Sequence, residues 1–149
     1  MLIVDKISVI VPCYNEEDVL PLFFQEVSHT LEEIENVDYE ILFINDGSHD
    51  HSEDILKVIA SKDKHCFYYS FSRNFGKEAA MYAGLENATG NYVVIMDADL
   101  QHPPHLLKPM YKALPKGDKG AIFRSERGRH KVGKTSRNMA RPYGRRRKR

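Results

Sequence analysis

Four short apolar segments recur along this 149-residue chain, and a polar turn and a longer amphipathic segment follow each of the first three. The four segments are rich in β-branched and aromatic residues, which favour strands; they are residues 7–12, 39–44, 66–71 and 92–96. Between them, apolar residues recur at three- and four-residue steps, the period of a helix with one buried face. Strands that alternate with helices predict an α/β fold with a mostly parallel sheet and helices on both faces.

The expected helices carry local start signals. Asn15 and the acidic residues after it suit a helix start, and Pro21 fits the first turn of the helix that follows. Asp50 and Glu53 have the spacing of a capping box for a second helix. A third helix is expected after the loop at residues 72–76.

Charge divides the chain into two regions. Residues 1–114 hold 8 Lys and Arg against 19 Asp and Glu, whereas residues 115–149 hold 14 against 2. Since the second region has no amphipathic period, we expect a folded domain over 1–114 and a disordered basic tail over 115–149. No apolar run approaches the ~20 residues of a membrane span, and the N-terminal residues lack a signal-peptide pattern. We therefore expect the chain in the cytoplasm or at the cytoplasmic face of the membrane.

The predicted topology brings four polar clusters together. Right-handed crossovers place the carboxyl ends of parallel strands at one edge of the sheet, where open α/β sheets bind ligands. The clusters that lie at these strand ends are residues 12–16, 45–48, 73–77 and 97–101. Their convergence is the main functional signal of the sequence.

Asp97 and Asp99 end the last apolar segment, two residues apart, so that both side chains point to one side of an extended chain. Two carboxylates this close repel each other unless a cation lies between them and an anionic ligand. Mg²⁺ and Mn²⁺ prefer oxygen ligands, often one or two carboxylates together with substrate phosphates. Gln101 offers an amide oxygen on the same side. We predict a Mg²⁺ or Mn²⁺ site at Asp97, Asp99 and Gln101, against the alternative of a solvated acidic turn.

Five more side chains at this edge have ligand-binding chemistry, and each has a structural alternative. Asp46 can accept hydrogen bonds from a nucleobase or a ribose hydroxyl, or form a simple Asx turn. Tyr14 can stack on a base and Glu16 can accept from a ribose or base donor; the alternatives are a packed aromatic ring and an acid at a helix start. Arg73 and Lys77 suit a phosphate or an anionic sugar substituent, or form a solvated basic loop.

The sequence lacks the motifs of several other enzyme classes. It has no G-x-G-x-x-G, no P-loop and no G-x-S-x-G, and its histidines show no zinc-ligand spacing. These features argue against dinucleotide oxidoreductases, P-loop kinases, α/β-hydrolases and zinc sites.

Four motifs taken together resemble the family 2 glycosyltransferases of the GT-A fold. They are VPCYNE at 11–16, NDGS at 45–48, RNFGK at 73–77 and DADLQHPP at 97–104. Within that family, the chain is most similar to the branch of dolichyl-phosphate mannosyltransferase and the undecaprenyl-phosphate glucosyltransferases. The resemblance covers residues 6 to about 114 and implies a Rossmann-like, nucleotide-sugar-binding half of the fold.

The resemblance also implies site residues and a reaction. The residues that would contact the nucleoside are Pro12, Tyr14, Glu16 and Asp46. Asp97 and Ala98 would line the ribose and diphosphate, and Asp99 and Gln101 would bind Mg²⁺ or Mn²⁺. Asp99 is the implied catalytic residue. The reaction would move a hexose from a nucleotide diphosphate sugar to a polyprenyl phosphate in the membrane, with inversion. Such reactions serve the synthesis of cell-envelope glycans, and full-length relatives are membrane-associated.

Beyond residue 114 the family pattern is not visible, and three questions stay open. Residues 115–149 read as a frameshifted or truncated continuation, or as a genuine basic tail that attracts anionic lipid or nucleic acid, although no specific nucleic acid is expected. The chain either transfers sugar or binds the nucleotide-sugar without transfer. The acceptor, finally, is either a polyprenyl phosphate or a hydroxyl of a polysaccharide or protein glycan.

Overall fold

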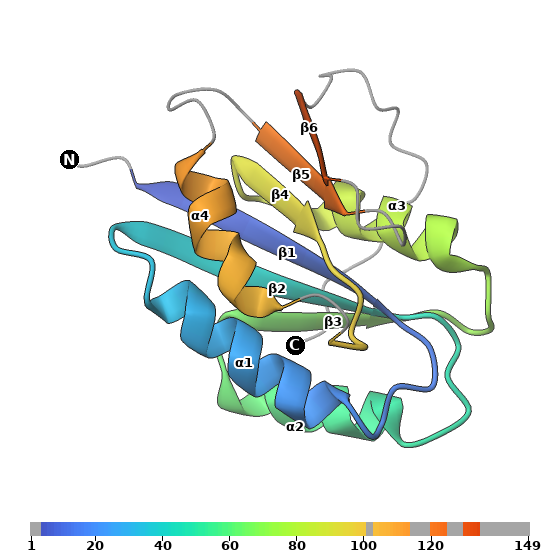
Figure 1. Cartoon of the computed structure of the whole chain (residues 1–149). Helices are drawn as coiled ribbons and strands as arrows, with labels where there is room; N and C mark the ends of the chain where they lie inside the picture. Colours follow the sequence, from blue (N-terminus) through green and yellow to red (C-terminus); the bar gives the residue numbers. More distant parts are fainter. Residues whose placement is uncertain (1–3, 101–102, 114–119, 125–129, 135–149) are drawn as a thin grey trace.

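The computed structural model describes residues 4–100, 103–113, 120–124 and 130–134. Its elements alternate in the expected way (Figure 1). In chain order they are β1 (Asp5–Cys13), α1 (Leu20–Glu32), β2 (Val37–Asn45), α2 (Ser52–Lys62), β3 (Cys66–Ser70), α3 (Lys77–Asn87), β4 (Tyr92–Ile95), a 3-10 turn (Pro104–Leu106), α4 (Leu107–Lys112), β5 (Gly120–Arg124) and β6 (His130–Lys134).

One sheet contains all the described strands, in the order β3-β2-β1-β4-β5-β6. The pairs β1–β2, β1–β4, β2–β3 and β4–β5 are parallel, and only the β5–β6 pair is antiparallel. The register sets Cys13 beside Asn45 and Asn45 beside Ser70, so that β1, β2 and β3 end side by side. The predicted α/β class and mostly parallel sheet are confirmed.

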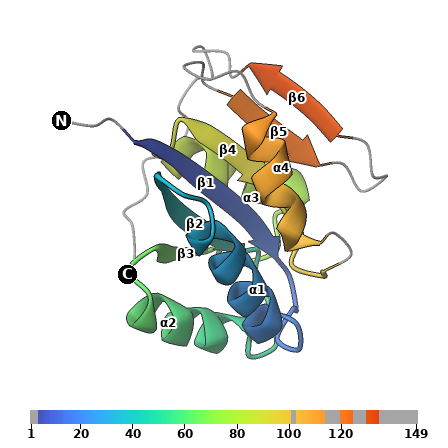
Figure 2. The same cartoon turned by 60° about the vertical axis from the view of Figure 1, so that its left-hand side comes forward.

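Helices cover both faces of the sheet, as predicted. α1, α2 and α4 lie on one face and α3 lies on the other (Figure 2). Strand side chains alternate between two cores: Val9 and Phe43 pack under α1 and α2, whereas Ile10 and Leu42 pack under α3. A Cβ on Gly84 of α3 would lie 2.3 Å from the Ile10 side chain, which shows how closely this helix approaches β1.

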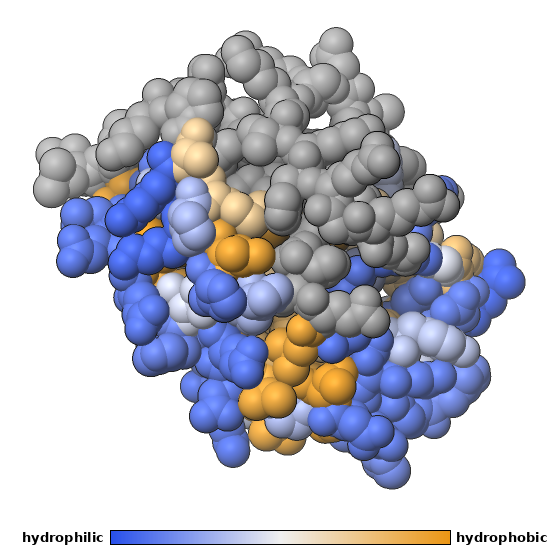
Figure 3. Space-filling model, viewed as in Figure 1, coloured by the Kyte–Doolittle hydropathy of each residue, from blue (hydrophilic) through white to orange (hydrophobic). Residues whose placement is uncertain are grey.

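The surface above the first core is mostly polar, with an apolar area over α1 (Figure 3). Exposed apolar side chains of the described residues on this side include Leu22 of α1 and Val58 of α2. Scattered exposed apolar residues are ordinary on soluble domains. Within the described part of the chain, no helix is both long enough and apolar enough to span a membrane.

Two local predictions differ from the structure at helix starts. Pro21 lies in the first turn of α1 as expected, but Asn15 does not cap that helix: it adopts a positive φ of 52° and accepts a hydrogen bond from the His49 amide. The predicted capping box of Asp50 differs in detail: the residue before α2 is His51, but Asp50 Oδ1 accepts a hydrogen bond from the amide of Ser52, the first residue of α2, at 2.9 Å. Contacts between separate loops decide both positions.

The expectation of a tail without regular structure departs from the structure at two segments. β5 extends the parallel sheet beyond β4, and β6 pairs antiparallel with β5. Pairing with the open edge of an existing sheet satisfies backbone hydrogen bonds in segments whose own sequence signal is weak. Residues 114–119, 125–129 and 135–149 lie outside the described residues, so the prediction stays untested there.

Candidate functional site

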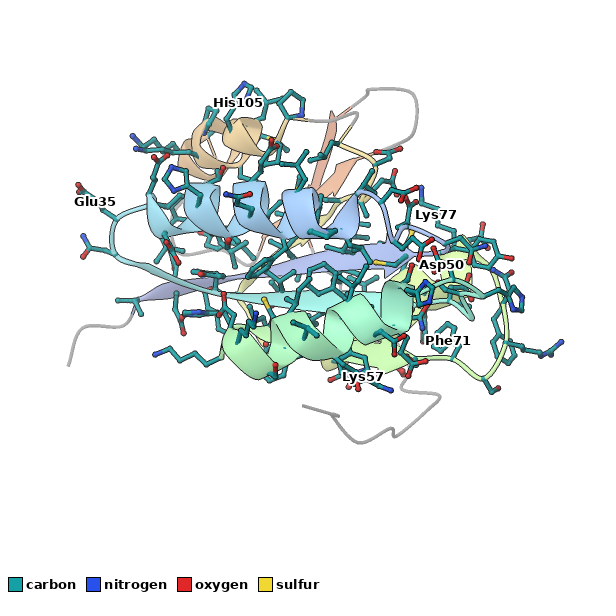
Figure 4. The ribbon with its side chains drawn as sticks, turned by 90° about the horizontal axis from the view of Figure 1, so that it is seen from below. Glu35, Asp50, Lys57, Phe71, Lys77 and His105 are labelled. Atoms are coloured by element: carbon teal, nitrogen blue, oxygen red, sulfur yellow. The ribbon has the colours of Figure 1, made fainter. Side chains whose placement is uncertain are left out.

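The four polar clusters gather at the carboxyl edge of the sheet, as the topology requires. Figure 4 shows Lys77, Asp50 and Phe71 at this end of the molecule and Glu35 at the opposite end. The labelled side chains at this end come from the segments that follow β2 and β3. Residues far apart in the sequence therefore share one surface.

Hydrogen bonds connect the loop after β1 to the segment after β2. Backbone amides donate to side-chain oxygens in five of them: Asn15 to Ser48 (3.0 Å), Glu16 to Ser52 (2.9 Å), Glu17 to Asp50 (3.2 Å), His49 to Asn15 (2.8 Å) and His51 to Glu17 (2.9 Å). Because donors and acceptors come from both loops, each loop fixes the other. The segment that carries Tyr14 and Glu16 is thus held rigidly at the edge.

Carboxylates from three loops converge at this edge. Burial raises the pKa of Glu16, and the negative charges of Asp99, Asp97 and Asp50 raise it further. Burial also raises the pKa of the Cys13 thiol, with added contributions from Glu16 and Asp97. Burial is the largest cause of both shifts, and the neighbouring carboxylates add to it, so negative charge is concentrated at this edge, which favours a bound cation.

The chemistry of this donor set fits a divalent metal only in part. Among the described residues, no three His, Cys, Asp or Glu side chains are grouped closely enough to hold an ion by themselves. Mg²⁺ and Mn²⁺ commonly complete such sites with substrate phosphate oxygens and water. The arrangement therefore suits an ion that arrives with a diphosphate.

The DAD segment follows β4 after one residue, Met96, and its Ala98 and Asp99 lie in a turn. The Met96 amide still donates to the Ile10 carbonyl, so the extended path continues to the first carboxylate. Ala98 is buried while Asp99 is exposed, and Lys77 Nζ lies 2.8 Å from Asp97 Oδ1. Of the predicted metal ligands, Gln101 lies outside the described residues.

Asp46 is placed against the chain's own backbone. Its side chain is buried, and its Oδ1 accepts a hydrogen bond from the Phe75 amide at 2.7 Å. Its Oδ2 accepts from the Gly76 amide at 3.1 Å and from Asn74 Nδ2 at 3.2 Å. The structure thus uses both oxygens of this carboxylate to hold the loop between β3 and α3.

The remaining predicted residues are more open. Tyr14 is 45% exposed, and Pro12 is half-buried at the end of β1. The Arg73 guanidinium lies 4.4 Å from the centre of the Phe75 ring. A cleft of about 580 Å³ borders the ends of β2 and β3, and its lining includes Arg73 and Ser48. Aromatic and basic groups therefore flank the carboxylates.

Sequence reasoning missed Asp50 and Asn74. Asp50 lies close enough to Glu16 to affect its pKa and binds the Glu17 and Ser52 amides. Burial acts to raise the pKa of Asp50, but hydrogen bonds from Ser52 and Glu17 outweigh it, and the pKa is lowered. The spacing of Asp50, four residues after Asp46, was the available signal, and it was read as a helix cap.

Comparison with known proteins adds a family and a set of relatives. The sequence model described as glycosyl transferase family 2 matches residues 8–149. The chain is 46% identical over 107 residues to the prophage bactoprenol glucosyl transferase homolog of Escherichia coli K12, covering 69% of this chain and 35% of that protein. It is 47% identical over 111 residues to the putative glycosyltransferase CsbB of Bacillus subtilis 168, covering 74% and 33%. The chain thus spans about a third of the length of these relatives.

Solved structures share the fold at low sequence identity. The mannosyltransferase PcManGT of Pyrobaculum calidifontis, in complex with GDP-Man and Mn²⁺, aligns with a TM-score of 0.62 and 23% identity over 76% of this chain and 34% of that one. Residues 1–349 of TarS from S. aureus align with a TM-score of 0.56 and 24% identity over 72% and 31%.

Proposed function

The chain belongs to glycosyl transferase family 2, and from that premise we propose that its carboxyl edge binds the nucleotide diphosphate sugar of a hexosyl transfer. The solved relatives share its fold, as the GT-A prediction required. The observation that carries the proposal is the convergence of the Glu16, Asp97 and Asp99 carboxylates at one edge, with Lys77 in an ion pair with Asp97.

Asp97 and Asp99 are proposed to hold Mg²⁺ or Mn²⁺, with Gln101 as the predicted third ligand. When bound, the cation would act as a Lewis acid on the departing diphosphate. The two carboxylates support this role, because Mg²⁺ and Mn²⁺ commonly bind one or two carboxylates together with substrate phosphate oxygens. The Mn²⁺ in the complex of the Pyrobaculum relative is of the expected kind.

The chain's other residues are assigned to the nucleotide and the sugar. Tyr14 is exposed enough to stack on the base, and Pro12 is half-buried two residues before it in the chain. Ala98 lies between the two carboxylates and would line the ribose. Arg73 and Lys77 are cations at the same edge and are assigned to the phosphates or to an anionic sugar substituent.

The proposed acceptor of the whole protein is a polyprenyl phosphate at the cytoplasmic face of the membrane. Relatives whose names specify bactoprenol glucosyl transfer support this choice. A phosphate oxygen is already anionic and needs no strong general base, whereas a hydroxyl acceptor would need one. Direct attack by that oxygen on the anomeric carbon would invert its configuration.

A second candidate is binding of the nucleotide-sugar without transfer. It requires only the polar groups at the carboxyl edge, which include the Asp97–Lys77 ion pair and Glu16. The donor motifs all lie within residues 8–149, which the family model matches.

A transfer assay separates the two candidates. The protein would be incubated with radiolabelled UDP-glucose or GDP-mannose, Mn²⁺ and vesicles that contain undecaprenyl phosphate. Transfer predicts labelled lipid that disappears with EDTA and with Asp99→Asn, but not with Glu35→Gln, the same charge change at the opposite end of the molecule. Donor binding without labelled lipid supports the second candidate, and no binding of either donor contradicts both.

A further inference from the structure

We propose that the open edge of β3, the side that faces away from β2, is an interaction surface for an extended acidic segment of another protein. The segment would add a strand to the sheet and pair its carboxylates with lysines of α2 and of the turn before β3. This surface begins where β3 begins, at the end of the sheet opposite to the carboxyl edge. The inference therefore goes beyond the proposed function and does not depend on it.

The outward main-chain groups of β3 have no strand partner among the described residues. Within that part of the chain, β3 is the last strand on its side of the sheet and pairs only with β2 (Figure 1). The His65 carbonyl and the Phe71 amide each form a 2.9 Å hydrogen bond with β2. Main-chain groups of successive strand residues point alternately to the two sides, so the odd-numbered residues face β2. The carbonyl of Cys66 and both main-chain groups of Tyr68 therefore face the open side.

A groove of about 510 Å³ follows this edge, and both outward-facing residues, Cys66 and Tyr68, line it. The side chains of these two residues are buried in the core under α1 and α2. The rest of the lining comes from α2 and the turn before β3, namely Lys57, Ala60, Ser61, Lys62 and Lys64. Because two of these residues are small, the helix leaves room for a chain beside the strand.

The charged side chains around the groove are lysines. Lys57, Lys62 and Lys64 are all exposed, and Lys57 projects from α2 (Figure 4). Of the three, Lys57 alone has an ion-pair partner within the described part of the chain, Glu53 at 3.9 Å. Lysines beside an open edge oppose pairing between two copies of the same strand, because both copies carry the same charge. An acidic strand meets the opposite charge.

The turn that carries Lys64 is fixed in place. Asp63 Oδ1 accepts a hydrogen bond from the His65 amide at 2.9 Å and lies 2.9 Å from His65 Nδ1. The His65 ring stacks on Tyr39 of β2, with 4.1 Å between the ring centres. Asp63 is thus engaged within the turn, and the backbone at Lys64 is held beside the groove.

Charge and strand geometry together define the occupant. Residues 135–149 of this chain contain Arg and Lys but no Asp or Glu, so like charge opposes them as the occupant. In an added strand, every second side chain points to the same face of the sheet. Acidic residues at alternate positions would therefore lie toward α2 and its lysines. Main-chain hydrogen bonds would supply affinity, and the carboxylates would supply specificity.

Amide hydrogen exchange tests the mode of binding on the whole chain. The probe is a short synthetic peptide of alternating threonine and glutamate, and exchange is followed by NMR. With the peptide bound, the Tyr68 amide should exchange on the order of tenfold more slowly, the effect of one new hydrogen bond. The Phe67 and Tyr69 amides, which face β2, should change little. Absence of binding, or binding without protection of Tyr68, would overturn the proposal.

Charge reversal tests the specificity. Lys62→Glu combined with Lys64→Glu should weaken binding of the acidic peptide roughly tenfold, since each exposed ion pair contributes little. The same variant should bind a matched peptide of alternating threonine and lysine more tightly than the unaltered protein does. Lys108→Glu combined with Lys112→Glu, on α4, has the same net charge and should retain the original preference. Equal weakening by both double variants would mean unspecific attraction and would overturn the proposal.

Two other occupants give different results. If the lysines bind a membrane, vesicles of phosphatidylglycerol bind the unaltered protein, charge reversal at Lys62 and Lys64 abolishes this binding, and the acidic peptide does not protect Tyr68. If a second copy of the chain occupies the edge, sedimentation shows a dimer, and Tyr68 is protected without any peptide. Either result would overturn the proposal.

Discussion

Two buried carboxylates, Glu40 in β2 and Asp46 directly after it, hold the loops at opposite ends of helix α3. Asp46 holds the loop before α3, at the carboxyl edge of the sheet. Glu40, which is 1% exposed, holds the loop after α3: its Oε1 accepts from Ser8 Oγ at 2.8 Å, the Thr89 amide at 2.7 Å and Thr89 Oγ1 at 2.9 Å. The distance along the strand from Glu40 to Asp46 is comparable to the length of α3, since six strand residues span ~20 Å and the 11 residues of α3 span ~16 Å.

The same kind of contact, a buried carboxylate that accepts backbone amides, has different consequences at the two ends of α3. At both positions a buried carboxylate accepts backbone amides of a connection to α3. Only the Asp46 loop continues into a residue, Lys77, that contacts the carboxylates of the proposed ligand site. The loop held by Glu40 leads into β4 at the opposite edge. Glu40 therefore serves as an internal control that separates support of the fold from support of the site.

The largest expected effect is on stability, from Glu40→Ala. The change leaves Ser8 and the Thr89 amide without their acceptor and Lys6 without its partner, which lies 3.7 Å away. We expect a loss of about 2–5 kcal/mol in the free energy of unfolding, because two buried donors lose their acceptor at a cost of about 1–3 kcal/mol each. Urea denaturation followed by circular dichroism measures it.

The same variant also tests the comparison. Under conditions in which Glu40→Ala is folded, its affinity for UDP or GDP should equal that of the unaltered protein. A weakened affinity in the folded variant would show that the two ends of α3 are not independent.

A pair of glycine substitutions probes the same contrast with a smaller effect. A Cβ on Gly47 would lie 2.3 Å from Arg73, and a Cβ on Gly90 would lie 2.5 Å from the Lys6 carbonyl oxygen. Each change to alanine should cost about 1–3 kcal/mol of stability, as overpacking does, with added backbone strain at Gly47 because of its positive φ. Only Gly47→Ala should weaken nucleotide binding. Equal effects of the two variants on affinity, measured by calorimetry, would remove the distinction.

The smallest effect concerns the charge of Glu16. Its pKa is raised above 4.5 by burial and then by Asp99 and Asp97, so the folded state binds this proton more tightly than the unfolded state does. Stability should therefore fall as pH rises through 4.5 and through the higher pKa of the folded state. Glu16→Gln should be more stable than the unaltered protein at pH 7, by roughly 0.5 kcal/mol after solvent screening.

Thermal unfolding as a function of pH checks the sign. The advantage of Glu16→Gln should vanish below the ordinary pKa of a glutamate, where both proteins are neutral at this position. Glu35→Gln, at the far end of the molecule, should show no such dependence on pH. An advantage that persists at low pH would indicate a packing effect and not relief of charge repulsion.

Local sequence signals were sufficient for most of the fold. The apolar segments ending at Pro12, Ile44, Phe71 and Met96 predicted parallel strands, and the polar turns after them predicted the edge at which the carboxylates meet. β5 and β6 were not predicted, because their pairing depends on the edge of β4 and not on a strong pattern of their own.

The site was predictable in its residues but not in their partners. The spacing of Asp97 and Asp99 indicated a carboxylate pair, and the structure places Glu16 beside it. The bonding of Asp46 depends on amides 29 and 30 residues later in the chain. No local pattern distinguishes an aspartate that awaits a ligand from one that already holds a loop. The same limit applied to Asp50, whose partners lie in the loop after β1.

The central claim is that the carboxylates at the carboxyl edge bind a nucleotide diphosphate together with a divalent cation. Calorimetric titration of UDP and GDP with Mn²⁺ tests it most directly, on the unaltered protein, on a variant with both Asp97→Asn and Asp99→Asn, and on Glu35→Gln. The account predicts Mn²⁺-dependent binding that Glu35→Gln retains and that the double variant loses by about a hundredfold or more, as expected when two charge-assisted contacts are removed. Binding that is equally tight in the double variant, or in EDTA, would contradict it.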